Sequence, residues 1–512
     1  MIKEVQNPII PLDYPDPDVI RVADTYYMVT TTMHFMPGCE ILRSYDLVNW
    51  EHATFVYDQL DSTPAQKLEE HANIYGRGMW AATIRYHKNK FYIIFVANDT
   101  RTTYLYTSAN IEGPWQKSII EGFYHDCSLF FDDDERAYLV YGNKDIWLTE
   151  LNNELTGPKH DGIHKIIVTD HNNPNLGYEG AHFYKINGKY YVFLIHSLPD
   201  RWMRVQACYQ SNSIDGQYVG GDVLQDTRDY CGQGVAQGGI VDTPEGEWYA
   251  ILFQDHGAVG RLPVLLPIEW NEDYPVFGVA GKVPKVFKAT STRPIHSYTP
   301  LVSGDDFKTT YPQYYGLDPK WQFNHEPNES GFKVNTNEGY FEISTTKVVK
   351  NLTQAPNTLT QRMLLPSCSA EVQLDATDLM EGDFAGLCAF QGAYGFVGVT
   401  KANGQYYLVM HSRELDNMSL QAMDHDHAPG KEWGRVAIDS PIVTLKLKAD
   451  FDQMKDVTQF YYQDNGLFKQ IGIDHKVAFK LDHFTGCRFG LFCFATKELE
   501  GSARFSTFKY LK

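Results

Sequence analysis

Three acidic residues occupy matching positions in a repeated sequence pattern. They are Asp16 in YPDPD, Asp126 in HDCS and Glu179 in GYEGAH, and each opens a stretch rich in β-forming residues. Taken singly, each has an ordinary explanation: Asp beside Pro favours a turn, Asp126 can cap a turn, and Glu179 can pair with a basic side chain. Their shared place in the repeat is what makes the set a candidate for chemistry.

Carboxyl groups that gather in one place repel each other and lose solvation, so a cluster of them indicates function. Hydrolysis of a glycosidic bond needs one neutral acid to protonate the leaving oxygen and one carboxylate to act as base or nucleophile. A third carboxylate would raise the pKa of the acid by like-charge repulsion. We therefore interpret the three residues as the catalytic set of a glycosidase.

The elements that must position these residues are hairpins that recur through the first half of the chain. Each has a β-rich strand, a turn of Asp, Asn, Gly or Lys, and an aromatic-rich strand, and a further strand follows most of them. Repeats of about 50 residues with four strands are typical of β-propeller blades, and a β-sandwich is the alternative. Innermost strands line a central channel, so residues at equivalent strand starts converge at one end. The five hairpins begin at Asp16, Trp80, Asp126, Glu179 and Gln237.

The sequence predicts an all-β protein with two domains. Residues 1–280 are expected to form a five-bladed β-propeller that carries the catalytic residues. Residues 281–304 contain Pro, Ser and Thr with little apolar periodicity, which indicates a linker. Residues 305–512 hold short strands and almost no helical periodicity, which predicts a jelly-roll-like β-sandwich. This accessory domain is expected to pack against the propeller, and either to lend a loop to the pocket rim or to bind sugar independently.

The composition excludes several classes of partner. There are 64 acidic and 45 basic residues, giving a formal net charge of -19. Such a surface repels phosphate backbones and anionic lipid, so we expect no nucleic acid or membrane partner and favour a neutral oligosaccharide. Eight scattered cysteines without a C-x-x-C motif favour free thiols. With no leader visible at the start, a cytoplasmic enzyme is the expectation.

The three acidic motifs and the repeats together resemble glycoside hydrolase family 43, the five-bladed propeller enzymes that include α-L-arabinofuranosidases and β-xylosidases. The resemblance runs from Asn7 to about Gly278 in the propeller and extends to the accessory sandwich. It implies that Asp16 is the general base, Asp126 tunes and orients the acid, and Glu179 is the general acid. It also implies inversion, for which the base and acid carboxyl groups should lie about 6.5–9.5 Å apart.

The same resemblance points to substrate-binding residues. Trp80 matches a family tryptophan, and it either stacks on the sugar or packs in the channel wall. Arg261, in GAVGRLP, matches an arginine that reaches the substrate and the carboxylates, with a structural salt bridge as the alternative. His34 and Phe35, in TTMHFMPG, are expected at the pocket rim, with packing in the core as the alternative.

One position departs from the family pattern. Many relatives have a His, associated with a cation in the channel, where this chain has Gln237. His256, in FQDHGAVG, is the candidate to replace it as a metal ligand, or else it is an ordinary core residue. A Ca²⁺ ion there would be held mainly by water, with the histidine a minor ligand. It would organise the channel without being required for the chemistry.

These expectations converge on an exo-acting, inverting α-L-arabinofuranosidase that releases terminal arabinose from arabinoxylan or arabinan oligosaccharides. A β-D-xylosidase, or an enzyme with both activities, is the near alternative because both sugars are pentoses. A propeller that binds carbohydrate without catalysis is an alternative from another class. A retaining glycosidase of a related propeller clan is a third.

Overall fold

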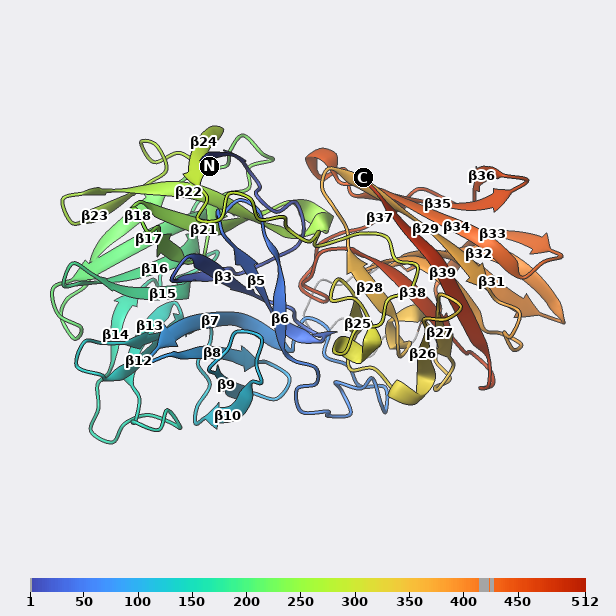
Figure 1. The fold of residues 1–512 in the computed structure, drawn as a ribbon, viewed down its shortest axis with the longest axis horizontal. Helices are drawn as coiled ribbons and strands as arrows, with labels where there is room; N and C mark the ends of the chain where they lie inside the picture. Colours follow the sequence, from blue (N-terminus) through green and yellow to red (C-terminus); the bar gives the residue numbers. More distant parts are fainter. Residues whose placement is uncertain (1, 414–422, 424–427) are drawn as a thin grey trace.

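The computed structural model describes residues 2–413, 423 and 428–512, and it shows two β-domains joined side by side (Figure 1). The N-terminal domain is a propeller and the C-terminal domain is a sandwich of two sheets. The described residues contain strands and short 3-10 turns, and none of their helices is long and apolar enough to cross a membrane. The predicted all-β architecture, a five-bladed propeller followed by a β-sandwich, is confirmed.

Each propeller blade is an antiparallel sheet whose strands follow chain order. Blade 1 comprises β2 (Asp18–Val22), β3 (Thr25–Thr30), β5 (Gly38–Ser44) and β6 (Glu51–Tyr57). Blade 2 comprises β7 (Met79–His87), β8 (Lys90–Ala97), β9 (Thr102–Ser108) and β10 (Gln116–Ile120). Blade 3 comprises β11 (Ser128–Phe131), β12 (Ala137–Asn143), β13 (Asp145–Glu150) and β14 (His164–Thr169). Blade 4 comprises β15 (Glu179–Ile186), β16 (Lys189–Ser197), β17 (Arg204–Ser211) and β18 (Val219–Leu224).

Blade 5 has a divided inner strand. It comprises β19 (Val235–Ala236), β20 (Ile240–Asp242), β21 (Trp248–Asp255), β22 (Arg261–Asn271) and β23 (Tyr274–Phe277), with both short strands paired to β21. Outside the blades, β1 (Ile2–Gln6) pairs antiparallel with β24 (Val286–Thr290). The segment predicted as a linker therefore contains a strand, which returns to the N-terminus of the chain.

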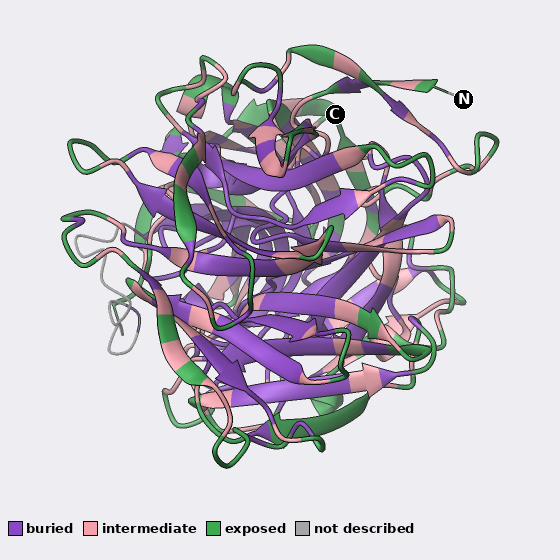
Figure 2. Ribbon diagram, turned by 90° about the vertical axis from the view of Figure 1, so that its left-hand side faces the viewer, coloured by how far each residue is buried: buried purple, intermediate pink, exposed green. Residues whose placement is uncertain are grey.

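The blades pack through aromatic and aliphatic side chains that alternate along their strands. Figure 2 shows a buried interior, with exposed residues concentrated in loops and outer strands. Blades 1 and 2, for example, share a cluster that contains Ile41, Ile84, Phe95 and Tyr104. A single blade cannot bury both of its faces, so this radial packing provides the core of the propeller.

The channel below the inner strand starts is filled by a hydrogen-bonded network centred on Asp18. This buried carboxylate accepts from Thr83 Oγ1 at 2.9 Å and Arg85 Nη1 at 2.7 Å, and it lies 3.1 Å from His182 Nδ1. Arg85 also donates to Ser128 Oγ at 2.7 Å. Burial opposes ionisation, but the charges of Arg85 and His182 hold the pKa of Asp18 well below its usual range. A charged network therefore plugs the channel beneath the carboxylates.

The sandwich consists of two antiparallel sheets. In order across the first sheet lie β33 (Lys431–Ile438), β32 (Gln405–Ser412), β31 (Gly395–Ala402), β30 (Phe384–Phe390), β38 (Arg488–Phe494), β28 (Leu359–Arg362), β25 (Gln322–Asn324) and β4 (Phe35–Met36). Across the second lie β26 (Phe332–Asn335), β27 (Tyr340–Ser344), β39 (Ser502–Leu511), β29 (Ser367–Asp375), β34 (Ile442–Asp450), β35 (Val457–Asp464) and β36 (Leu467–Gln470), with β37 (His475–Lys476) on β35. The 3-10 turns are η1 (Gly257–Val259), η2 (Tyr314–Gly316), η3 (Glu329–Gly331), η4 (Leu352–Gln354) and η5 (Asp452–Met454).

One short strand of the propeller completes a sandwich sheet. β4 pairs with β25, with Met36 opposite Phe323 and Phe35 opposite Asn324. Because of this pairing, His34 and Phe35 lie in the domain interface, where both are fully buried. Phe35 lies beneath the Arg488 guanidinium at 3.5 Å. The prediction that His34 and Phe35 line the pocket rim is therefore wrong, because their strand belongs to the sandwich edge.

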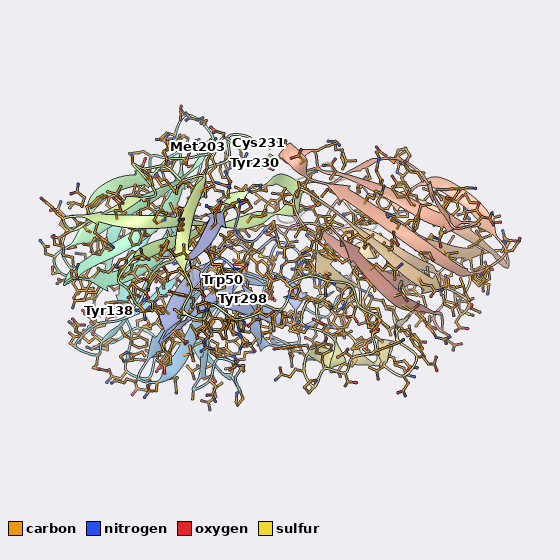
Figure 3. All side chains as sticks on the ribbon, turned by 45° about the horizontal axis from the view of Figure 1, so that its top comes forward. Trp50, Tyr138, Met203, Tyr230, Cys231 and Tyr298 are labelled. Atoms are coloured by element: carbon orange, nitrogen blue, oxygen red, sulfur yellow. The ribbon has the colours of Figure 1, made fainter. Side chains whose placement is uncertain are left out.

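The cysteines are free, as their spacing predicts. Seven of the eight are buried, and Cys231 is exposed. Cys231 and its neighbour Tyr230 lie at the edge of the propeller toward the sandwich (Figure 3). There the Cys231 thiol lies 3.6 Å from Gln453 Oε1 of the sandwich.

Candidate active site

The three predicted carboxylates lie in one cavity at one end of the channel. Asp16 and Asp126 each precede the first strand of their blade by two residues, and Glu179 is the first residue of β15. The cavity has a volume of about 300 Å³, and its lining also includes Trp80 and Arg261. The repeat register thus brings together residues from four blades and from β22.

The backbone is unusual where it presents these side chains. Asp16 and Asp126 have φ values of 53° and 48°, and Gln237 at the equivalent place in blade 5 has 55°. The left-handed region is disfavoured for residues with a Cβ atom, and such positions concentrate at functional sites. In blades 2 and 4 the register shifts after Trp80 and after Glu179. Bulges at these positions re-aim side chains toward the channel.

Asp16 is held at both carboxylate oxygens. Thr31 Oγ1 donates to Oδ2 at 2.7 Å, and Arg261 Nη1 donates to Oδ1 at 2.7 Å. All three residues are buried. A charged, two-sided set of hydrogen bonds fixes the carboxylate in one orientation and balances its charge.

The second group of charges is formed by His125, Asp126 and Glu179. Their potential ligand atoms lie within 4.8 Å of one another. His125 Nε2 is 3.6 Å from Asp126 Oδ2 and 3.6 Å from Glu179 Oε2. Asn143 Nδ2 donates to Glu179 Oε2 at 2.6 Å. The imidazole therefore lies between the two carboxyl groups.

The environment raises the pKa of two members of this group. Burial, together with the charges of Glu179 and Asp16, raises the pKa of Asp126 to about 7 despite the nearby His125. Burial opposes protonation of His125, but Asp126 and Glu179 raise its pKa to about 9. At neutral pH the site thus contains an imidazolium beside a carboxyl group that titrates near neutrality, and protons can be shared within the group. The sequence argument expected a raised pKa on the acid, whereas the structure places one on Asp126.

Trp80 and Arg261 form the base of the cavity together with a side chain from the sandwich. Phe484 lies 5.6 Å from the Trp80 ring and 4.8 Å from the Arg261 guanidinium. Trp80 Nε1 and Arg261 Nε and Nη2 are buried, and no atom of the described residues accepts their hydrogen bonds. Buried donors are normally satisfied, so three unpaired donors beside one cavity are unusual.

The sandwich contributes Leu481 and Phe484 to the cavity lining. The loop that carries them is tied to the propeller by Asp13, whose carboxylate accepts from Gly486 N at 2.7 Å and from Arg261 N at 2.8 Å. Cys487 N donates to Ala258 O at 2.8 Å. The accessory domain therefore builds part of the cavity wall, one of the two roles expected for it.

His256 does not lie in an environment that suits a metal ion. It is buried, its Nε2 is 3.2 Å from Gln254 Oε1, and its ring packs on Tyr230 at 4.1 Å. Burial and the charge of Arg228 lower its pKa to about 3. Among the described residues, the one cluster with metal-ligand spacing is His125, Asp126 and Glu179, which does not include it. The neighbouring guanidinium would repel a cation, so these residues do not fit Ca²⁺ at this place.

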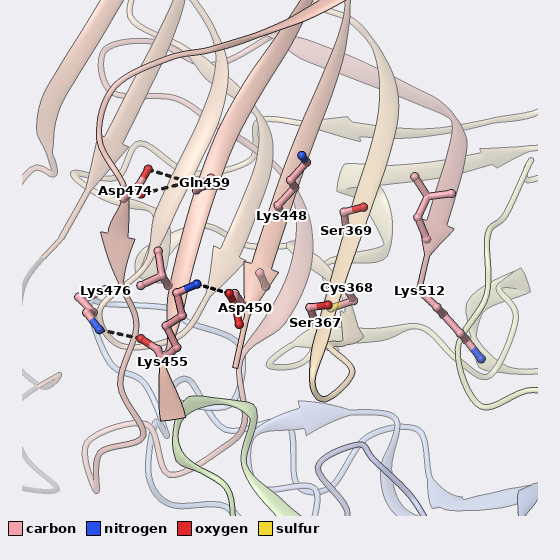
Figure 4. A pocket seen from close by; sticks show the side chains of 13 residues that line it. Ser367, Cys368, Ser369, Lys448, Asp450, Lys455, Gln459, Asp474, Lys476 and Lys512 are labelled. Atoms are coloured by element: carbon pink, nitrogen blue, oxygen red, sulfur yellow. Dashed lines mark hydrogen bonds and ion pairs between the residues drawn. The ribbon is translucent and has the colours of Figure 1, made fainter. Parts of the chain in front are cut away.

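A larger cavity lies elsewhere, on the sandwich (Figure 4). Its volume is about 450 Å³, and its lining includes Lys448, Lys455, Asp450 and Asp474. Both carboxylates there are engaged, Asp450 by Lys455 and Asp474 by Gln459. The three carboxyl groups that suit hydrolysis lie together in the smaller cavity of the propeller, which is therefore the candidate active site.

Sequence reasoning missed several residues of the site. His125 was present in the HDCS motif, and its place beside Asp126 was the available signal. Trp202 lies between β16 and β17, and Arg204 is the first residue of β17, where no motif marks them. Arg204 Nε donates to Asp255 Oδ2 at 2.6 Å.

Comparison with known proteins agrees with this geometry. A family model described as glycosyl hydrolases family 43 matches residues 5–275. The chain belongs to this family. A second model, described as a beta xylosidase C-terminal Concanavalin A-like domain, matches residues 305–511. The protein is thus a glycoside hydrolase, and its substrate is a carbohydrate.

Curated relatives of this glycoside hydrolase carry two activities in their names. A beta-xylosidase of Formosa agariphila is 25% identical, over 98% of this chain and 90% of the relative. A non-reducing end alpha-L-arabinofuranosidase of Bacteroides ovatus is 26% identical, over 87% of this chain and 85% of the relative. The names of these relatives therefore do not decide between xyloside and arabinofuranoside substrates.

Solved structures resemble the whole chain. A bifunctional GH43-CE protein of Bacteroides eggerthii is 39% identical with a TM-score of 0.90, and it covers 100% of this chain. The chain spans 64% of that protein's length. A GH43 glycoside hydrolase engineered to display endo-xylanase and exo-arabinofuranosidase activity is 28% identical, with a TM-score of 0.87 and 99% of each chain covered.

Proposed function

We propose that this enzyme is an inverting, exo-acting glycoside hydrolase that releases terminal α-L-arabinofuranose from oligosaccharides of arabinoxylan or arabinan. The observation that carries the proposal is the small cavity that contains all three carboxylates. Its volume of about 300 Å³ is at the lower end of the range for small-molecule sites. Such a space suits one terminal sugar and its neighbour better than the middle of a long chain.

The geometry supports a division of roles among the carboxylates. Asp16 is the base that activates water, because its two hydrogen bonds fix the carboxylate and Arg261 balances its charge. Glu179 is the acid that protonates the leaving oxygen. Asp126, with His125 beside it, orients Glu179 and sets the electrostatics of the pair. Inversion requires room for water between base and acid, and Asp16 lies outside the compact group that includes Glu179.

β-D-Xylosidase is the second candidate, and a specific observation favours it. The accessory domain matches a model described for beta xylosidases, and the Formosa relative that covers 98% of this chain has that name. Arabinofuranose and xylopyranose are both pentoses, so one cavity can accept either sugar.

Paired assays on nitrophenyl α-L-arabinofuranoside and nitrophenyl β-D-xyloside test the choice. We expect a higher kcat/KM for the arabinofuranoside. A preference for the xyloside of more than about tenfold, or ~1.4 kcal/mol in the barrier, would establish the second candidate instead. NMR of the first-formed sugar should show the inverted anomer, and a retained anomer would contradict the assigned roles.

Two substitutions test the roles directly. Glu179→Gln removes the acid, so we expect a loss of about 10²–10⁴ on an oligosaccharide and a much smaller loss on a dinitrophenyl glycoside, whose leaving group needs no proton. Asp16→Asn removes the base, so it should lose activity on both substrates. If the two variants lost activity on the oligosaccharide and on the dinitrophenyl glycoside in the same proportion, the division of roles would be contradicted. A propeller that only binds sugar would show no turnover in the parent enzyme.

A further inference from the structure

Two large apolar side chains at the active-site cavity are exposed to solvent. Trp202 is 54% exposed and Leu481 is 49% exposed, and both belong to the cavity lining. The carboxylates of the same cavity are buried or nearly so. The cavity therefore has a charged, enclosed base and an apolar, open mouth. Exposed apolar side chains at the edge of a cavity indicate a binding surface.

Trp202 projects from a loop whose backbone is held by hydrogen bonds. Met203 N donates to Ser197 Oγ at 3.1 Å, and Leu198 N donates to Met203 O at 2.9 Å. Asn175 Nδ2 donates to Leu198 O at 2.8 Å, which ties this loop to the segment that carries Leu176, another lining residue. The backbone is thus held in place while the indole remains in solvent, an arrangement suited to stacking rather than to core packing.

The charges near Trp202 are already balanced. The Arg204 guanidinium lies 5.7 Å from the indole, and its Nε donates to Asp255. A ligand at the mouth therefore meets apolar surface and a neutral ion pair, with no free charge offered by these residues. That chemistry fits the C–H face of a neutral sugar ring, which can lie flat on an indole.

The two ends of the cavity must divide the substrate between them. The sugar to be released occupies the base, where the carboxylates, Trp80 and Arg261 lie. Atoms beyond the scissile bond have to pass through the mouth to reach solvent. The leaving part of the substrate consequently meets Trp202 from the propeller and Leu481 from the sandwich.

We propose that Trp202 and Leu481 form the subsite for the leaving group, and that its occupant is the first pyranose ring of a neutral oligosaccharide. This inference rests on the proposed function, because it assigns the far side of the bond that the carboxylates cleave. The subsite belongs to both domains, so the sandwich takes part in selecting the chain from which the terminal sugar is removed.

The test compares two substrates that share the terminal pentose and differ in the leaving group. One releases methanol and the other releases xylobiose. For Trp202→Ala, the ratio of kcat/KM for the xylobioside to kcat/KM for the methyl glycoside should fall about tenfold. Trp202→Phe, which keeps an aromatic face, should restore most of the ratio. An unchanged ratio for Trp202→Ala would overturn the proposal.

Leu481→Ala should lower the same ratio, by about threefold, because the side chain is smaller. The matched control is Leu467→Ala, on β36 of the sandwich, whose side chain is 72% exposed and lies outside the cavity lining. It should leave the ratio as in the parent enzyme. A fall of equal size in the control would show that the effect is not due to the subsite.

A binding measurement separates this inference from the proposed function. Calorimetry should show that arabinofuranosyl-xylobiose binds the Asp16→Asn variant about tenfold more tightly than it binds the double variant Asp16→Asn/Trp202→Ala. Equal affinities would overturn the subsite, whatever the turnover assays show. Failure of the parent enzyme to hydrolyse either pentoside would instead overturn the proposed function.

Discussion

At the scale of single residues, the site gives each of three similar carboxyl groups a different partner. Asp16 is bound by Arg261 and Thr31, and Glu179 is bound by Asn143. Asp126 has a histidine at 3.6 Å and two like charges nearby. Different surroundings are how one site gives chemically similar groups different tasks.

Asp126→Asn tests this electrostatic arrangement through stability. The pKa of Asp126 is raised from 3.8 to about 7, so the folded protein holds a proton that the unfolded chain releases. Its contribution to stability is therefore lost as pH rises from about 4 through 7. We expect the change in Tm caused by Asp126→Asn to be about 2–4 °C more positive at pH 8 than at pH 4, as measured by thermal unfolding. Turnover should fall.

Asp132→Asn is the matched control. Burial opposes ionisation of Asp132, but hydrogen bonds from Lys185 and Tyr190 lower its pKa. Loss of this carboxylate should lower Tm at pH 8. A lower Tm for Asp126→Asn at pH 8 would mean that its carboxylate is charged and stabilising in the folded protein.

At the scale of elements, the cavity depends on how one sandwich loop seats against the propeller. Asp13 accepts from the backbone of Gly486 in the loop and from the backbone of Arg261 at the start of β22. The same residue thereby positions Phe484 and the arginine that holds Asp16. A small shift of this loop changes both the wall and the base of the cavity.

Gly486→Ala should displace that loop. An added Cβ would lie 2.3 Å from Val259 O and 2.7 Å from Asp13 Cβ, and neither group can move freely. We expect kcat/KM to fall by about tenfold, mainly through KM, in steady-state assays, because misplacing a positioning group impairs binding geometry. Gly221→Ala is the control, since nothing lies within 4 Å of its added Cβ. Equal losses in the two variants would argue against a role for the loop position.

At the scale of the whole molecule, the domains are joined by a buried junction rather than by a linker alone. His34 lies against His483 with ring centroids 4.6 Å apart and against His325 at 5.1 Å. All three are buried, and burial together with neighbouring positive groups lowers their pKa values. These three histidines therefore stay uncharged as long as the protein is folded.

This junction predicts sensitivity to acid. Unfolded histidines take up protons near pH 6.5 whereas these three do not, so stability is present above that pH and is lost as pH falls below it. We expect Tm to drop between pH 7 and pH 5, and His34→Gln to reduce that slope. His160→Gln, at a side chain that is 94% exposed, should keep the slope of the parent. A slope for His34→Gln equal to that of the parent would contradict the expectation.

The sequence was sufficient for features set by local repetition. The blades, and the meeting of Asp16, Asp126 and Glu179, follow from strand patterns and turn residues that recur at matching positions. The same reasoning failed for His34 and Phe35, because β4 joins a sheet of the other domain. Phe484 and Leu481 reach the cavity from a distant part of the chain without a motif. The sequence could not show whether the surroundings of His256 suit a metal ion, because Arg228, whose charge acts on this histidine, is not near it in the sequence.

The division of the cavity wall between domains has a consequence for synthesis. The propeller leaves the ribosome first, with its three carboxylates in place but with β4 unpaired and the cavity lacking Leu481 and Phe484. At roughly 5–20 residues per second, translation of residues 305–512 takes roughly 10–40 s. During that interval the nascent chain exposes the unpaired edge of β4 and lacks the part of the cavity wall that the sandwich provides. Completion of the sandwich covers the edge and creates the competent site in the same step.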